Sequence, residues 1–196
     1  MEQKQIELIN VEWLYDFWKY WVTWLPQKEG IFQVADFDYT IFSRDEQMKS
    51  ESIFREKRWD EAPKFFFKER GMQNYIETYF QNRSFPKDII QKLDSSRDII
   101  ITAWMYEWQL AKIRTLKELN NFRVINTSNW SEKIVELIRY ILFELRYIPS
   151  EIIVYEDRPQ YFVEYRELIE EVLGTKLTVM YVEMDGNNGY KKIEAI

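Results

Sequence analysis

Short apolar runs alternate with longer amphipathic segments over the second half of the chain. Three segments with helical periodicity, 105–120, 131–146 and 159–173, predict helices, with Ser131 as the N-cap of the second and Gly174 ending the third. The apolar runs predict five buried strands: IFQVA at 31–35, DIIIT at 98–102, FRVIN at 122–126, IIVYE at 152–156 and KLTVMYVEM at 176–184. This alternation predicts an α/β fold in which a doubly wound parallel sheet is covered by helices on both faces.

An aromatic-rich segment precedes the first strand. Residues 5–25 predict a helix that ends at Pro26 and Gly30. Its apolar face contains Leu14, Phe17, Trp18, Trp21 and Leu25, and Trp13 and Trp24 widen that face. We favour the interpretation in which this helix packs on the domain. The alternative is a dimer contact or a helix on a membrane surface, since so many tryptophans could form an exposed patch.

The segment 43–97 is mostly polar and predicts a helical insert, with helices near 61–70, 72–82 and 87–94. Within it, FREKRWDEAPKFFFKERG at 54–71 interleaves aromatic and basic residues. We favour an amphipathic helical pair whose aromatic side chains form core, because acidic residues nearly balance the basic ones. The alternative is a stacking and phosphate-binding surface for a nucleotide or a nucleic-acid end.

The chain of 196 residues fits a single domain with a sizeable core. Residues 1–30 then supply a helix that packs on this core, and residues 43–97 supply the insert. The start, MEQKQIELIN, lacks the apolar segment of a secretory signal. The apolar stretch that follows carries charges and is shorter than the ~20 residues that cross a bilayer. We therefore expect a cytoplasmic protein without a membrane partner.

The composition excludes several kinds of chemistry. The sequence contains no cysteine and no histidine, which removes thiol nucleophiles, histidine general bases and zinc sites built on either residue. A bound metal would therefore have oxygen ligands, as Mg²⁺, Ca²⁺ and Mn²⁺ do. The formal net charge of −6 also argues against broad electrostatic binding to nucleic acid.

Polar side chains follow the predicted strands at the points where these end. Asp36, Asp38 and Thr40 follow the first strand, Thr102 ends the second, Lys133 opens the helix after the third, and Glu156 and Asp157 end the fourth. The carboxyl ends of parallel strands meet at one edge of the sheet, where ligands bind. Four carboxylates there would repel one another unless a cation neutralised them, and a hard cation such as Mg²⁺ suits them.

The two-residue spacing of Asp36 and Asp38 allows the two carboxylates to do different work. One can reach a metal and attack an electrophile, while the other donates or accepts a proton. A nearby hydroxyl and ammonium group suit the oxygens of a phosphoryl group.

These motifs resemble those of the haloacid dehalogenase (HAD) superfamily. DFDYT at 36–40 is similar to its Asp-x-Asp-x-Thr motif, ITAW at 101–104 to its second motif, Lys133 to its third and VYEDR at 154–158 to its fourth, in the family's order. The resemblance implies a HAD-like Rossmannoid fold, with 43–97 as a helical cap between the first two motif strands. VYEDRPQYF and RWDEAPKFF are also similar to the HAD domains of Swiss Army knife RNA repair proteins.

The resemblance also implies roles for individual residues. Asp36 would be the nucleophile and Asp38 the general acid and base, while Thr102 and Lys133 would bind the transferring phosphoryl group. Asp36, Glu156, Asp157 and the backbone carbonyl of Asp38 would hold Mg²⁺, with the main ligand of the acidic pair left open. Thr40, Ala103 and Arg158 would contact substrate, although Arg158 could equally pair with Glu156. Tyr39 replaces a common glycine, and Ala103-Trp104 replaces the frequent Gly-Arg or Gly-Asn.

The expected activity is that of a Mg²⁺-dependent phosphatase that forms an aspartyl-phosphate and acts on a phosphorylated metabolite, nucleotide or nucleic-acid end. One alternative is a catalytically silent HAD-fold interaction module that uses the tryptophan-rich helix and the aromatic insert. Another is a receiver-like domain whose aspartate is phosphorylated by a partner. The second aspartate, Asp38, and the long gap between the first two strands count against the receiver. The sequence leaves the substrate and the oligomeric state open.

Overall fold

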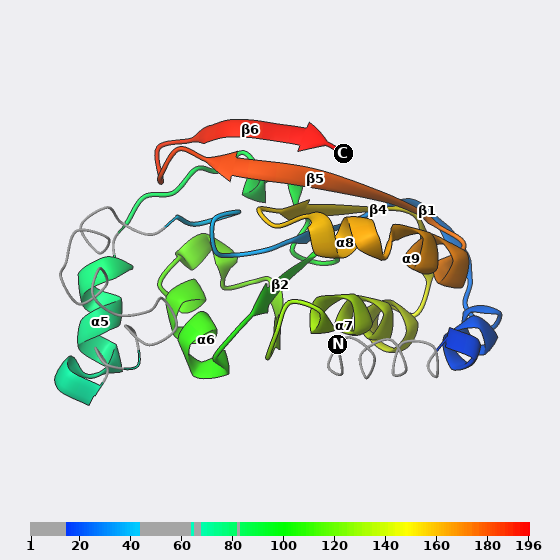
Figure 1. Cartoon of the computed structure of the whole chain (residues 1–196), viewed down its shortest axis with the longest axis horizontal. Coiled ribbons are helices and arrows are strands. Elements are labelled where there is room, and N and C mark those ends of the chain that lie inside the picture. The colour runs from blue at the N-terminus through cyan, green and yellow to red at the C-terminus, as the bar shows by residue number, and fades with distance from the viewer. Residues whose placement is uncertain (1–14, 44–63, 65–67, 82) are drawn as a thin grey trace.

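The computed structural model describes residues 15–43, 64, 68–81 and 83–196, and Figure 1 shows how they are arranged. Within these residues a six-stranded sheet has helices on both sides. The strands are β1 (Gln27–Ala35), β2 (Ile99–Ala103), β3 (Arg123–Thr127), β4 (Ile148–Glu156), β5 (Lys176–Met184) and β6 (Tyr190–Ala195). The helices include α5 (Met72–Tyr79), α6 (Tyr106–Arg114), α7 (Glu132–Tyr140), α8 (Gln160–Glu164) and α9 (Arg166–Leu173).

The strand order is β3-β2-β1-β4-β5-β6. Strands β1 to β5 are parallel, which confirms the predicted α/β class and parallel sheet, and β6 is antiparallel to β5. The sequence pattern does not predict β6, because YKKIEA is mostly polar and forms an edge strand that is buried little. The order reverses at β1, and ligands of such sheets bind beyond the carboxyl ends of the strands at this place.

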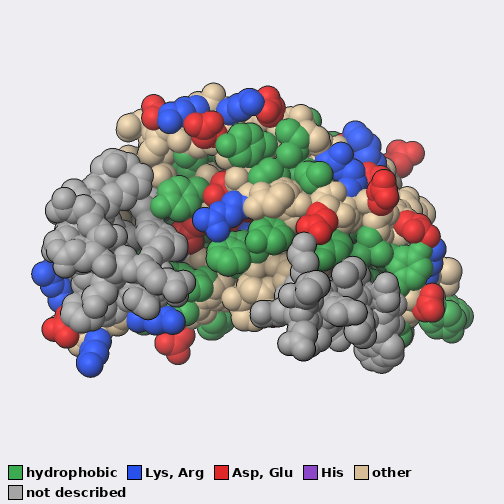
Figure 2. Space-filling model, viewed as in Figure 1, with side chains coloured by type: hydrophobic (Ala, Val, Ile, Leu, Met, Phe, Trp, Pro, Cys, Tyr) green, Lys and Arg blue, Asp and Glu red, His purple; other side chains and the backbone are tan. Residues whose placement is uncertain are grey.

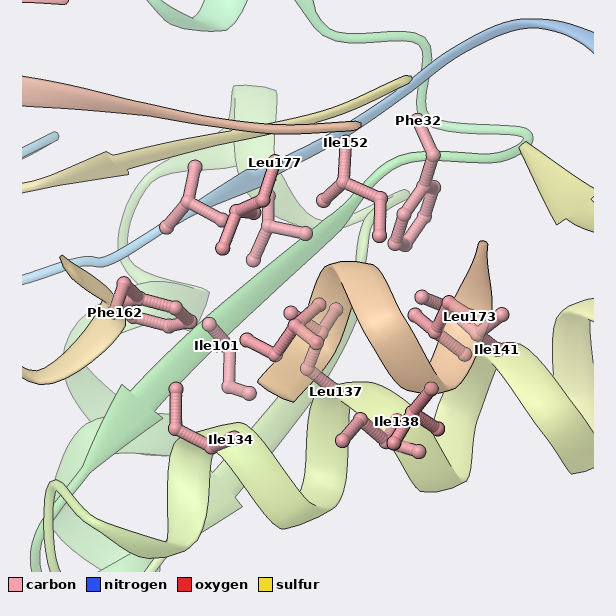
Figure 3. Packing of buried hydrophobic residues seen from close by; sticks show 14 of the residues in the cluster. Phe32, Ile101, Ile134, Leu137, Ile138, Ile141, Ile152, Phe162, Leu173 and Leu177 are labelled. Carbon is pink, nitrogen blue, oxygen red and sulfur yellow. The ribbon is translucent and has the colours of Figure 1, made fainter. Parts of the chain in front are cut away.

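One face of the sheet packs against α7, α8 and α9. Alternate strand residues such as Phe32, Ile152 and Leu177 point toward this layer, where Leu137 and Leu173 meet them, as Figure 3 shows. Each of these five side chains is almost fully buried. This cluster is the larger apolar core and anchors the helix that carries Lys133 at its start.

The opposite face packs against α5 and α6. Ile100 and Tyr155, which alternate with the residues of the first core, contribute to a second buried cluster. Tyr75 of α5 stacks on Trp108 of α6, with ring centroids 4.6 Å apart, and both rings are buried. The second cluster therefore anchors α6 and joins the described part of the insert to the body of the domain.

Several helix boundaries differ from the prediction. The expected helix at 87–94 is only a 3-10 turn at Ile90–Lys92, although Phe85, Ile89 and Leu93 enter the second core at the i, i+4, i+8 spacing of a helix. The segment 105–120 forms α6 and then a 3-10 turn at Lys117–Leu119.

The helices around the second half of the sheet also depart from the simple pattern. Helix α7 continues as a π-helical turn at Ile141–Leu145 and ends at Arg146, whose φ is 57°. The segment 159–173 is divided into α8 and α9, and Gly174, with φ of 64°, ends it as predicted.

Ser131 stands at the predicted N-cap position of α7, but its side chain does not cap the helix. It already has helical dihedral angles, and its hydroxyl donates to Asn129 Oδ1 instead of accepting from the helix. Asn129 Oδ1 also accepts from the backbone amide of Glu132 at 3.1 Å, so Asn129 takes over the capping role.

The aromatic segment before β1 forms a helix at residues 15–22, while its predicted part before residue 15 lies outside the described residues. Trp18 is buried in the first core and Trp21 packs edge-on against Phe143, so the described part of the helix contacts this core. Trp24, in contrast, is 68% exposed. Gly30 does not end the helix: it lies within β1, beside the irregularity between Lys28 and Ile31.

Residues 44–63, 65–67 and 82 of the predicted insert lie outside the described residues, and these include most of 54–71. Helix α5 confirms a helix near the predicted 72–82. The cap role of 43–97 stays a prediction. None of the helices that the structure describes combines the length and apolarity needed to cross a bilayer.

Candidate active site at the carboxyl ends of the strands

The carboxyl ends of β1 and β4 bring Asp36 and Glu156 together. The two strands are in register from Ile31 to Ala35, with Ala35 opposite Tyr155. The amide of Asp36 then continues the ladder by donating to the carbonyl of Tyr155 at 2.9 Å. Asp36, directly after β1, and Glu156, the last residue of β4, therefore lie at the same edge of the sheet, as the strand-end pattern predicts.

Lys133 links these two carboxylates. Its ammonium group donates to Asp36 Oδ1 at 2.8 Å and to Glu156 Oε2 at 2.7 Å. All three side chains are almost fully buried, with 1%, 7% and 2% of their side-chain surfaces exposed. The predicted meeting of Lys133 with Asp36 is thus present, and its position at the start of α7 delivers it there.

Asp157 completes a cluster of acidic side chains with Asp36 and Glu156. One oxygen of each carboxylate lies within 4.8 Å of the others, so the three could hold a metal ion. These donors suit a hard cation, since all are oxygens. One buried ammonium faces three carboxylates here, which leaves net negative charge for a cation to balance.

Burial and mutual repulsion raise the pKa values of this acidic cluster. Burial raises the pKa of Asp36 to about 7, and the neighbouring Glu156 adds to the effect against the opposing pull of Lys133. Burial likewise raises the pKa of Glu156 to about 7. The pKa of Asp157 rises to about 6 through burial and the nearby charge of Asp36. Burial works to lower the pKa of Lys133, but Asp36 and Glu156 outweigh it and raise that pKa.

Asp38 is held by two residues that the sequence analysis did not assign to the site. Lys112 places its ammonium 2.6 Å from both oxygens of Asp38, and the Gln109 amide donates to Asp38 Oδ2 at 2.7 Å. Both partners are about 1% exposed. They lie three residues apart and so share one face of α6. The sequence signal that could have identified them is the helical spacing of Gln109 and Lys112, which lie next to the apolar positions of α6.

The loop after β1 turns sharply and sets the direction of Asp38. The carbonyl of Phe37 accepts from the amides of Ile41 and Phe42, and the Phe37 and Phe42 rings stack in the second core. Tyr39 lies at the tip with a φ of 63°, a left-handed conformation that non-glycine residues seldom adopt.

Thr40, like Lys133 and Glu156, does not line the pocket that the remaining predicted site residues surround. Its side chain is fully buried, and its backbone carbonyl accepts a hydrogen bond from the Tyr190 hydroxyl at 3.0 Å. A contact between Thr40 and substrate therefore stays a prediction.

A cavity of about 90 Å³ lies beside the acidic cluster, and we call it the strand-end pocket. Its described lining comprises Asp36, Asp38, Tyr39, Thr102, Ala103, Trp104, Gln109, Trp130, Asp157 and Arg158. The predicted residues Thr102 and Ala103 are therefore brought to the same place as the two aspartates. Figure 2 shows basic and acidic side chains set among hydrophobic ones on the face above the strand ends.

Arg158 lies on Trp130 at the edge of the strand-end pocket. Its guanidinium carbon is 5.2 Å from the centroid of the Trp130 ring. Of the two predicted alternatives, pairing with Glu156 involves only the Arg158 backbone amide, which donates to Glu156 Oε1 at 3.3 Å. The guanidinium instead approaches Asp157, with Nε 3.8 Å from Oδ2.

We expect Mg²⁺ binding to weaken as the pH falls. The raised carboxyl pKa values mean that protons compete for Asp36 and Glu156 below about pH 7 and for Asp157 below about pH 6. A cation must displace these protons. The affinity for Mg²⁺ should therefore fall at least ~10-fold from pH 8 to pH 5.5, and calorimetry at pH 7 should detect proton release through a dependence on the buffer.

A matched pair of variants checks where this cation binds. Asp157→Asn should weaken Mg²⁺ binding at pH 8, whereas Asp16→Asn, on the exposed side of the N-terminal helix, should leave it unchanged. An affinity that is the same at pH 8 and pH 5.5 would contradict the acidic cluster as the binding place.

Comparisons with known proteins add little to this geometry. No protein-family model matches the chain, and the search of curated proteins found no match. Among solved structures, the chain is similar to a protein from Burkholderia xenovorans LB400 that is provisionally described as a haloacid dehalogenase-like hydrolase. The match has 12% sequence identity and a TM-score of 0.41, and covers 79% of this chain and 82% of that one. A likeness at this level does not establish a shared fold or activity.

Proposed function

We propose that the protein is a HAD-like hydrolase that removes phosphate from phosphomonoesters through an aspartyl-phosphate on Asp36. The observation that supports this most is the buried contact of Lys133 with both Asp36 and Glu156, beside a pocket lined by Asp38 and Thr102. Residues of four motifs that are separated in the sequence thus lie close together, which supports the roles that the HAD resemblance implies.

In the proposed first step, an Asp36 carboxylate oxygen attacks phosphorus and the bond to the leaving oxygen breaks. Asp38 supplies the proton that the leaving oxygen takes up. Lys133 orients Asp36 through its 2.8 Å contact and counters negative charge on the phosphoryl oxygens. The Thr102 hydroxyl donates to the same oxygens.

In the second step, water attacks phosphorus of the aspartyl-phosphate, Asp38 takes up the water's proton, and phosphate leaves with Asp36 restored. Gln109 and Lys112 hold Asp38 in one orientation for both proton transfers. A positioned proton donor and acceptor of this kind contributes about 10²–10⁴-fold to a rate.

The fit of a metal to this site rests on the donor set. Asp36, Glu156 and Asp157 offer three clustered oxygens, and the HAD resemblance adds the backbone carbonyl of Asp38. When bound, Mg²⁺ would neutralise charge on the phosphoryl group and on the carboxylates around it. We therefore propose Mg²⁺ as the cofactor, with Lys133 keeping part of the charge balanced before it binds.

The test is phosphate release from a panel of monoesters that includes an aryl phosphate, sugar phosphates, nucleotides and phosphorylated oligonucleotides. We expect release with Mg²⁺ and none with EDTA, restored by added Mg²⁺. Turnover that is unaffected by EDTA would contradict the metal-dependent mechanism. No turnover of any monoester, together with a stable protein partner, would instead favour the silent interaction module.

A further inference from the structure

The strand-end pocket has an inner part and an outer part of different chemistry. Asp36 and Thr102 are 5% and 1% exposed, so the reactive groups lie inside. Tyr39, Trp104, Trp130 and Arg158 are more exposed and form what we call the pocket mouth. The mouth therefore presents three aromatic rings and one guanidinium to whatever extends outward from the reacting phosphate.

The size of the cavity separates the phosphate from the rest of a substrate. Pockets that enclose a small-molecule ligand measure about 300–1,000 Å³, whereas this cavity is about 90 Å³. It has room for a phosphoryl group but not for a whole nucleotide or sugar phosphate. The leaving group of a bound substrate must consequently contact the pocket mouth.

Trp104 is held rigidly in an unusual backbone conformation. Its φ is 116°, a conformation that non-glycine residues seldom adopt. Its amide donates to the Thr127 carbonyl at 2.8 Å, its carbonyl accepts from Asn126 at 2.8 Å, and its ring packs edge-on against Trp108 at 5.0 Å. The surrounding contacts thus keep a large flat ring at a place where the backbone alone would not favour one.

Trp130 faces the mouth from the β3–α7 connection. It is 39% exposed, and its carbonyl accepts from the amide of Lys133 at 3.1 Å, which ties its position to the catalytic lysine. Arg158 already lies over this ring. A planar cation on an exposed indole marks a surface on which another planar group can stack.

We propose that the pocket mouth is a leaving-group subsite that selects nucleotides, with the base stacked against Trp130 and with Trp104 and Arg158 beside it. The proposal rests on the proposed phosphatase function and names its substrate class. The substrate can be a free mononucleotide or the phosphorylated nucleotide at the end of an oligonucleotide, since both present a base, a sugar and a terminal phosphate.

The chemistry of the mouth favours a nucleoside over other leaving groups. Sugars are recognised by many hydrogen-bonding groups, whereas the described mouth residues offer mainly ring faces. In an aryl phosphate the ring is joined directly to the ester oxygen and therefore stays close to the reacting phosphorus. In a nucleotide the ribose separates the base from the phosphate and carries it outward to the mouth.

The test compares adenosine 5′-monophosphate with ribose 5-phosphate, which differ only in the base. Stacking of one base on an aromatic side chain changes binding by about 5- to 150-fold. We expect kcat/KM for the nucleotide to exceed that for ribose 5-phosphate by at least about fivefold in the wild-type protein. Trp130→Ala should remove most of this preference, mainly by raising KM for the nucleotide, while ribose 5-phosphate changes less than about twofold.

Two variants accompany this experiment. Trp130→Phe keeps an aromatic ring and should retain most of the preference for the nucleotide. Trp24→Ala replaces an exposed tryptophan of the N-terminal region and should leave kcat/KM unchanged for both substrates. Equal kcat/KM for the two substrates in the wild type, or an equal loss for both in Trp130→Ala, would overturn the proposal and leave the phosphatase function standing.

Binding to Asp36→Asn keeps the proposal testable if no monoester is hydrolysed. Such a result would remove the proposed function, but calorimetry with the same two ligands would still show whether the mouth prefers the nucleotide. An absence of preference would overturn the inference independently. Adding 5′- and 3′-phosphorylated oligonucleotides to the assay distinguishes the source: a higher kcat/KM than the mononucleotide indicates a strand end, and a lower one indicates the free nucleotide.

Discussion

Asp36→Asn is expected to lower Mg²⁺-dependent phosphate release by about 10³-fold or more. The amide that replaces the carboxylate is a poor nucleophile and cannot form the aspartyl-phosphate. The substitution preserves the shape of the side chain, and Lys133 keeps Glu156 as a buried partner at 2.7 Å. The measurement is the initial rate of phosphate release at saturating Mg²⁺ from whichever monoester the wild-type protein hydrolyses best.

Asp16→Asn is the matched control, because it makes the same chemical change at an exposed helix position. It should retain the wild-type rate. The folded state of Asp36→Asn can be checked by its urea unfolding curve, since a normal transition excludes misfolding as the cause of the loss. Full activity in a correctly folded Asp36→Asn protein would contradict the aspartyl-phosphate mechanism.

Lys133→Met is expected to destabilise the metal-free protein by about 3–5 kcal/mol at pH 8. The loss of the ammonium leaves Asp36 and Glu156 as neighbouring buried carboxylates beside Asp157. Phosphate release should fall sharply as well, because the substitution removes the ammonium group that contacts Asp36 and counters the charge of the phosphoryl oxygens.

The pH dependence separates this explanation from a simple packing defect. Without Lys133 the pKa values of Asp36 and Glu156 rise above their wild-type values of about 7, so the folded variant binds protons that the unfolded chain does not bind between about pH 4 and pH 8. The free energy of unfolding of the variant therefore decreases as the pH rises, and its deficit should be smaller at pH 5 than at pH 8.

Urea unfolding of the wild type, Lys133→Met and Lys117→Met at both pH values measures this effect. Lys117 is exposed, so its replacement should change stability little at either pH. A Lys133→Met deficit that is equal at pH 5 and pH 8 would indicate lost packing and would contradict the electrostatic role.

The sequence pattern was sufficient for the parts of the protein that depend on local signals. Short apolar runs rich in β-branched residues predict β2 and β5 to within one residue at each end. Gly174 ends α9 because its left-handed conformation suits glycine. Asp36, Thr102 and Glu156 could be grouped because parallel strands deliver their carboxyl ends to one edge.

Other features depend on partners that are distant in the sequence. Lys112 and Lys133 follow different strands, yet both are buried, and each contacts a different aspartate of the DFDYT motif. Nothing in the segment 105–120 by itself shows that α6 turns this side chain toward Asp38. The π-helical turn at Ile141–Leu145 and the edge strand β6 are likewise settled by packing and pairing.

The sequence by itself determined the α/β class, the parallel sheet and the set of acidic and basic residues at its carboxyl edge, because hydrophobic periodicity and strand polarity act along the chain. Only the tertiary structure decided that Lys133 joins Asp36 to Glu156, that Lys112 and Gln109 hold Asp38, and that Trp104 and Trp130 border the same pocket. The physical reason is that charge pairing and ring placement depend on distances between separate elements, and the packing of those elements on the sheet sets these distances.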